Sequence, residues 1–127
     1  MAFNTIRNRK FAEFFAGIGL VRLALENEGW NGVFANDFDP AKLEIYSQNF
    51  DSKDFHLVDI AELQAKHIPD VTLATASFPC TDLSLAGARQ GLAGKESGTL
   101  WRFLEILEDM GSRRPPLVLL ENVPGFF

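Results

Sequence analysis

A short apolar run, a turn and then an apolar pattern of helical period recur along this chain of 127 residues. The pattern predicts strands at 10–15, 32–36, 55–58, 71–77 and 117–120, and helices at 20–28, after Pro40 and at 98–110. Strands and helices that alternate at this spacing favour an α/β fold, with a mostly parallel, doubly wound sheet of about five strands and helices on both faces. Right-handed crossovers then place a ligand site at the carboxyl ends of the strands.

The length and composition narrow the class of protein further. With 46% hydrophobic and 23% charged residues, the chain has the composition of one globular domain. It has no apolar run of about 18 residues, which predicts no membrane span. The first ten residues are followed by no apolar signal core, which favours the cytosol. A single Cys excludes an internal disulfide, and with only two His the sequence predicts no metal site.

The net charge of −5 is concentrated in the middle of the chain. Residues 26–70 carry ten acidic and three basic side chains, whereas residues 1–25 carry four basic and one acidic. This distribution argues against a chain that grips nucleic acid unaided through a basic face. The acidic segment suits a ligand that offers hydroxyl or ammonium donors, and the alternative is a solvated acidic surface.

Two motifs after the first and second predicted strands are typical of nucleotide sites. The glycines of Phe15-Ala16-Gly17-Ile18-Gly19 allow close approach to a ligand at a helix N-terminus, although the same residues also suit a plain tight turn. Asp37, about twenty residues on, has the position of a carboxylate that binds a ribose diol, and Phe38 beside it offers a flat face for an adenine ring. The alternative is that Asp37 and Asp39 only shape the turn and cap the helix.

Two further motifs contain reactive side chains. Cys80 follows the fourth predicted strand in Ser77-Phe78-Pro79-Cys80, where a thiol is either a nucleophile or a small buried apolar group. Glu121 follows the apolar end of the fifth strand, which predicts partial burial and a general acid, or else a carboxylate that caps a turn. A nucleophile and an acid at adjacent strand ends make the combination more informative than either residue alone.

The motifs FFAGIGL, ANDFDP, VDI, SFPCTDLSLAG, SGTL and ENVPGF resemble, in that order, the N-terminal motifs of cytosine-5 DNA methyltransferases. The resemblance covers nearly the whole chain from Phe11 and implies a Rossmann-like S-adenosylmethionine-dependent methyltransferase fold. It implies that Cys80 is the nucleophile and that Glu121 engages the cytosine ring. It also implies a set of residues that line the S-adenosylmethionine site: Phe15, Ala16, Gly17, Ile18, Gly19, Asp37, Phe38, Asp59, Ile60, Pro79 and Leu100.

The residue types suit the chemistry that the resemblance implies. Addition of the Cys80 thiolate to carbon 6 of cytosine makes carbon 5 nucleophilic enough to take the methyl group. A cytosine in double-stranded DNA must be flipped out of the helix to reach such a site. The implied setting is the prokaryotic cytoplasm, in DNA methylation of the restriction-modification kind.

The chain departs from the family pattern at three places. Leu20 and Thr81 stand where the family usually has glycine and glutamine. The family pattern continues beyond Phe127 with a target-recognition region and further motifs. We therefore expect residues 1–127 to be the N-terminal part of a catalytic domain, either one half of a split enzyme that acts with a complementary polypeptide on double-stranded DNA or a fragment of a longer chain. The apolar strand before Glu121 is expected to leave an open edge for that polypeptide.

Three other functions remain open on the sequence alone. Transfer RNA is an alternative substrate, because a relative with the same motifs methylates its cytosines. A non-catalytic subunit that binds a partner is another alternative, against which the presence of both Cys80 and Glu121 argues. A nicotinamide-dependent oxidoreductase lacks support, since the third glycine of the dinucleotide motif is missing.

Overall fold

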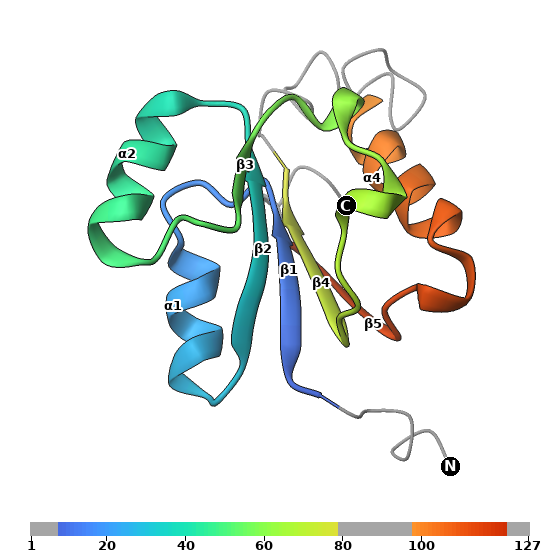
Figure 1. Ribbon diagram of the computed structural model, residues 1–127, viewed down its shortest axis with the longest axis horizontal. Coiled ribbons are helices and arrows are strands. Elements are labelled where there is room, and N and C mark those ends of the chain that lie inside the picture. Colours follow the sequence, from blue (N-terminus) through green and yellow to red (C-terminus); the bar gives the residue numbers. More distant parts are fainter. Residues whose placement is uncertain (1–7, 79–97, 122–127) are drawn as a thin grey trace.

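A computed structural model describes residues 8–78 and 98–121, which form one parallel sheet with helices on both faces (Figure 1). The strands lie in the order β3-β2-β1-β4-β5. Their bounds are Lys10–Phe14 for β1, Asn31–Asp37 for β2, Phe55–Leu57 for β3, Leu73–Ser77 for β4 and Leu117–Glu121 for β5. All four strand pairings are parallel, so the predicted doubly wound α/β sheet is confirmed.

The helices follow the strands as the sequence pattern predicts. Helices α1 (Leu20–Asn27) and α2 (Pro40–Asn49) cover one face, and α4 (Gly98–Asp109) lies on the other (Figure 1). The Asp39 carboxylate accepts a hydrogen bond from the Ala41 amide at 2.9 Å, which confirms Asp39-Pro40 as the start of α2. None of the helices in the described ranges is both long and apolar enough to span a bilayer.

The main apolar core lies between the sheet and α4. Phe14 of β1 and Phe103 of α4 are fully buried, and their ring centroids lie 4.9 Å apart. The short 3-10 turns η2 (Ile60–Glu62) and η3 (Ala65–His67) complete this layer, where Leu63 and Ile68 are buried. This core holds β1 and β4 side by side, which fixes the carboxyl ends of both strands.

The layer between the sheet and α1 contains a cluster of polar side chains, in contrast to the apolar core beneath α4. Glu13 of β1 is 2% exposed, and neither of its carboxylate oxygens meets a donor with full hydrogen-bond geometry. Burial raises the pKa of Glu13 to about 7, although the nearby Arg22 amide and guanidinium and the Tyr46 hydroxyl oppose that shift. Arg22 donates to the Tyr46 hydroxyl at 2.8 Å and pairs with Glu26 at 3.1 Å. This polar cluster joins β1, α1 and α2 next to the loop that follows β1.

Strand β5 lies at the edge of the sheet, and all five of its residues are exposed. Leu117, Val118, Leu119 and Leu120 each expose between 38% and 47% of their surface. An apolar edge strand of this kind is a site for pairing with another polypeptide. The expectation of an open apolar edge is therefore confirmed for the part of the chain that the structure describes.

Candidate active site

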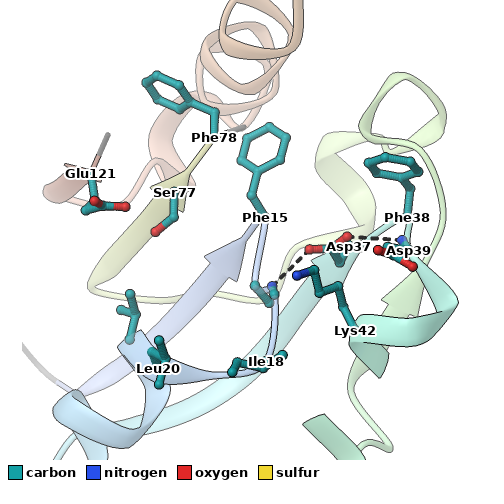
Figure 2. A pocket seen from close by; sticks show the side chains of 13 residues that line it. Phe15, Ile18, Leu20, Asp37, Phe38, Asp39, Lys42, Ser77, Phe78 and Glu121 are labelled. Atoms are coloured by element: carbon teal, nitrogen blue, oxygen red, sulfur yellow. Dashed lines mark hydrogen bonds between the residues drawn. The ribbon is translucent and has the colours of Figure 1, made fainter. Parts of the chain in front are cut away.

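A cavity of about 730 Å³ opens where the winding of the sheet reverses, at the carboxyl ends of the strands (Figure 2). Strand β1 pairs with β2 on one side and with β4 on the other, so the chain leaves β1 and β4 toward opposite faces of the sheet. The segments after β1 and β2 and the ends of β4 and β5 contribute the lining: Phe15, Ala16, Gly17, Ile18, Leu20, Val21, Asp37, Phe38, Asp39, Lys42, Ser77, Phe78 and Glu121.

The loop after β1 has an unusual backbone. Gly17 and Gly19 have φ values of 58° and 94°, and Phe15 has a φ of 53°. A non-glycine residue in this region costs about 1–3 kcal/mol and is found mainly where the surrounding structure enforces it, often at functional sites. A hydrogen bond of 2.9 Å from the Ala16 amide to the Asn36 carbonyl ties this loop to β2.

Asp37 connects the loop after β1 to the start of α2. One of its carboxylate oxygens accepts a hydrogen bond from the Gly17 amide at 2.9 Å, and the other accepts from the Asp39 amide at 3.1 Å. A carboxylate has about four acceptor positions, so each oxygen keeps capacity for a further donor. Asp37 is thus held in place by the backbone while it remains able to accept hydrogen bonds from a ligand in the cavity.

Aromatic side chains border the cavity on two sides (Figure 2). Phe38 is 65% exposed, which is unusual for a large apolar side chain and leaves one ring face free to stack on a planar ligand. Phe15 and Phe78 lie edge to face with ring centroids 6.2 Å apart. The cavity therefore combines acceptor oxygens with apolar faces, as sites for nucleosides require.

Glu121 lines the same cavity, but the prediction of its partial burial is wrong. Its side chain is exposed, because β5 is the edge strand and, within the described ranges, no helix or further strand covers it. Ser77 is the register partner of Glu121 and also lines the cavity. Cys80 and Pro79 lie outside the described residues, three and two positions beyond Ser77 in the sequence.

Six of the eleven predicted cofactor residues line the cavity: Phe15, Ala16, Gly17, Ile18, Asp37 and Phe38. Four others do not. Gly19 is buried, and Asp59 caps η2 by accepting a hydrogen bond from the Ala61 amide at 2.9 Å. Ile60 and Leu100 are 5% and 4% exposed and belong to the core beneath α4.

Sequence reasoning did not assign six of the lining residues to a ligand: Leu20, Val21, Asp39, Lys42, Ser77 and Phe78. Asp39 and Phe78 come soon after the predicted strands 32–36 and 71–77, where right-handed crossovers place a ligand site, so their positions in the sequence pointed to the cavity. Lys42 lies in the first turn of α2, where its charge alone indicates a solvated residue. Among the described residues, no three His, Cys, Asp or Glu side chains are placed to hold a metal ion.

Comparison with known proteins identifies the family of this chain. The chain matches the family of C-5 cytosine-specific DNA methylases over residues 9–127. It belongs to that family. The sequence is 37% identical over 117 residues to the type II methyltransferase M.HhaI of Haemophilus parahaemolyticus, and 35% identical over 115 residues to M.Bsp6I of Bacillus sp. strain RFL6. The resemblance read from the motifs is therefore confirmed.

Solved structures support the same placement for this C-5 cytosine methylase family member. The Dnmt2 methyltransferase of S. pombe superposes with a TM-score of 0.72 and 30% identity, covering 92% of this chain and 37% of that one. The matches to M.HhaI and M.Bsp6I cover 92% and 90% of this chain but only 34% and 36% of those relatives. The chain thus spans about a third of the length of the relatives it matches.

Proposed function

We propose that this chain provides the cofactor site and the nucleophile of an enzyme that transfers a methyl group from S-adenosylmethionine to carbon 5 of cytosine in DNA. The observation that carries the proposal is the cavity itself. In a chain of the C-5 cytosine methylase family, the loop after β1, Asp37 at the end of β2 and Glu121 at the end of β5 line one cavity. These are the segments at which the motifs place the cofactor and the cytosine.

The residues of the cavity fit S-adenosylmethionine. About 730 Å³ lies within the range for a ligand of this size. Asp37 keeps acceptor capacity for a ribose diol, and the exposed ring of Phe38 offers a stacking face for adenine. Gly17 has open space where a side chain would stand, so a ligand can approach its backbone closely. When bound, S-adenosylmethionine supplies an electrophilic methyl group.

Cys80 supplies the covalent step of the proposed reaction. Its thiolate forms a bond to carbon 6 of cytosine, and the electron pair of the carbon 5–carbon 6 double bond then makes carbon 5 nucleophilic. After carbon 5 has taken the methyl group, loss of its proton and breakage of the sulfur–carbon 6 bond restore the ring and the thiolate. In the sequence, Cys80 follows Ser77 by three positions, and Ser77 is the last residue of β4 and lines the cavity.

Glu121 acts on the opposite edge of the cytosine ring in this proposal. Its carboxyl group hydrogen-bonds the exocyclic amine and ring nitrogen 3, or gives nitrogen 3 a proton, which stabilises the charge that develops when Cys80 adds. A cytosine stacked inside a duplex cannot reach both residues, so the base must be flipped out. Holding base and methyl donor together in one site supplies much of the rate.

A complementary polypeptide is the second part of the proposal. The chain spans a third of its relatives' length, it carries a net charge of −5, and its edge strand β5 exposes four apolar residues. A partner that pairs with β5 and contributes basic residues would provide the electrostatic binding to DNA that this acidic chain does not provide.

Labelled methyl transfer tests the proposal. The chain is mixed with a polypeptide that corresponds to the part of the relatives that this chain does not cover. Transfer of the methyl group from radioactive S-adenosylmethionine to DNA is then measured. We expect transfer to depend on both polypeptides and to be abolished by Cys80→Ala. Transfer that survives Cys80→Ala contradicts the covalent mechanism, and full activity of the chain alone contradicts the need for a partner.

The same assay separates the alternative functions. When transfer RNA is added as a competitor, we expect DNA to remain the preferred substrate for methylation. Methylation of transfer RNA in preference to DNA would assign the site to that substrate. Absence of S-adenosylmethionine binding in the assembled pair would identify a subunit without catalytic function.

A further inference from the structure

Among the described residues that line the cavity, Lys42 has the only cationic side chain, and no motif assigns it a function. It is the third residue of α2, three positions after the capping Asp39. In Figure 2 its ammonium end points across the cavity toward the Asp37 carboxylate and the loop after β1. Lys42 therefore lines the same cavity as Asp37, the residue to which the proposed function gives the ribose.

The position of Lys42 is unfavourable for the helix. The first turn of α2 carries no acidic residue, and a cation there opposes the helix dipole. Within the described ranges, Lys42 makes no ion pair within 4 Å, and its ammonium group makes no hydrogen bond that would explain the placement. Residues that violate a local folding rule without compensation are often functional.

The chemistry of a ribose diol needs a group of this kind. Each hydroxyl has one donor hydrogen and two acceptor positions. The two Asp37 oxygens already accept backbone amides, and they have capacity for the hydroxyl hydrogens. The acceptor positions of the hydroxyl oxygens then remain unpaired, and an ammonium group pointing toward Asp37 is suited to fill them.

We propose that Lys42 is a further cofactor-binding residue, which donates to the ribose hydroxyl oxygens of the ligand whose hydroxyl hydrogens Asp37 accepts. The inference rests on the proposed function, because it concerns the same ligand. It makes Lys42 a specificity residue for a nucleoside that has both ribose hydroxyls, and it assigns Lys42 no part in the methyl transfer itself.

A double-mutant cycle between protein and ligand tests this inference. Binding of S-adenosylmethionine and of its 2′,3′-dideoxy analogue is measured by calorimetry for the unchanged chain, Lys42→Met and Lys53→Met, each paired with the complementary polypeptide. Lys53 is an exposed lysine in the turn before β3 and is the matched control. Lys42 is also exposed, so Lys42→Met is expected to fold, and a melting curve checks this.

We expect Lys42→Met to weaken the binding of S-adenosylmethionine about tenfold, the scale of a lost hydrogen bond from a charged donor, and to leave the dideoxy analogue unaffected. Lys53→Met should match the unchanged chain with both ligands. S-adenosylmethionine carries a net positive charge, so an effect of charge repulsion alone would tighten its binding to Lys42→Met. Tighter binding, unchanged binding or equal weakening of both ligands would overturn the inference.

Failure of the proposed function has a different signature. In that case the unchanged chain and Lys53→Met bind no S-adenosylmethionine even when paired with the complementary polypeptide. If the unchanged chain, Lys53→Met and Lys42→Met all bind S-adenosylmethionine equally well, only the role of Lys42 is contradicted.

Discussion

Substitution of Gly19 by alanine tests the packing that holds the loop after β1. Gly19 precedes α1 with a φ of 94°. A Cβ atom at this position would lie 2.5 Å and 2.9 Å from two ring carbons of Phe50, and 3.2 Å from a ring carbon of Tyr46. The aromatic side chains of α2 and its C-terminal end thus leave room only for glycine.

Two other glycines of the chain separate backbone strain from this contact. Gly17 and Gly111 have φ values of 58° and 59°, and a Cβ atom at either would meet nothing within 4 Å. Alanine in the left-handed region costs about 1–2 kcal/mol, which is the whole expected loss for Gly17→Ala and Gly111→Ala. Gly19→Ala adds the displacement of the Phe50 ring, for which overpacking costs of about 1–3 kcal/mol are typical. Its total is then about 2–5 kcal/mol.

Urea unfolding of the three variants, followed by circular dichroism, measures these free energies of unfolding. We expect Gly19→Ala to be the least stable, and Gly17→Ala and Gly111→Ala to lose similar, smaller amounts. Calorimetry adds a second distinction, because Gly17→Ala should weaken S-adenosylmethionine binding while Gly111→Ala should not. Equal stability of Gly19→Ala and Gly111→Ala would refute the claim that Phe50 and Tyr46 confine the loop.

Three further outcomes are expected. Asp37→Asn turns one acceptor into a donor that faces a backbone amide, so urea unfolding should show a loss of about 1–3 kcal/mol and calorimetry a weaker cofactor affinity. Phe103→Ala should cost about 3–5 kcal/mol because the ring is fully buried, whereas exposed Leu104→Ala should cost less than about 1 kcal/mol in the same unfolding assay. Burial raises the pKa of Glu13 from 4.5 to about 7, so the folded chain binds the proton more tightly and should lose about 3 kcal/mol of stability as the pH rises from about 4.5 to 7. Glu13→Gln should remove that loss, and parallel pH profiles of the two proteins would contradict the assignment.

The sequence predicted the sheet because each strand is a short apolar run closed by a recognisable turn. Asp39-Pro40 marks the start of α2 through local chemistry alone, and the structure has the helix begin there. The place of Asp37 and of the glycine loop in one site could be predicted from their order along the chain, since parallel strands bring their carboxyl ends to one edge of the sheet. Local signals of this kind were sufficient to predict most of the strands and helices.

The burial of side chains depends on neighbours that the sequence pattern does not identify. The prediction for Glu121 assumed that an apolar strand buries the carboxylate after it, but β5 is the edge strand and is exposed. In α1 the apolar residues Leu20 and Leu23 are 67% and 51% exposed, whereas Arg22 of the same helix contacts Tyr46 and Glu26. A helical period identifies a helix, but it does not say which face meets the sheet.

The most direct test of the central claim is a covalent complex with DNA that contains 5-fluorocytosine. Fluorine at carbon 5 cannot leave as a proton does, so the sulfur–carbon 6 bond persists after methyl transfer. The chain is incubated with its complementary polypeptide, this DNA and S-adenosylmethionine, and mass spectrometry of the denatured product locates the adduct. We expect a fluorocytosine that carries the transferred methyl group and is bound to Cys80. Methylation of ordinary cytosine DNA by the same mixture with no adduct at Cys80 would contradict it.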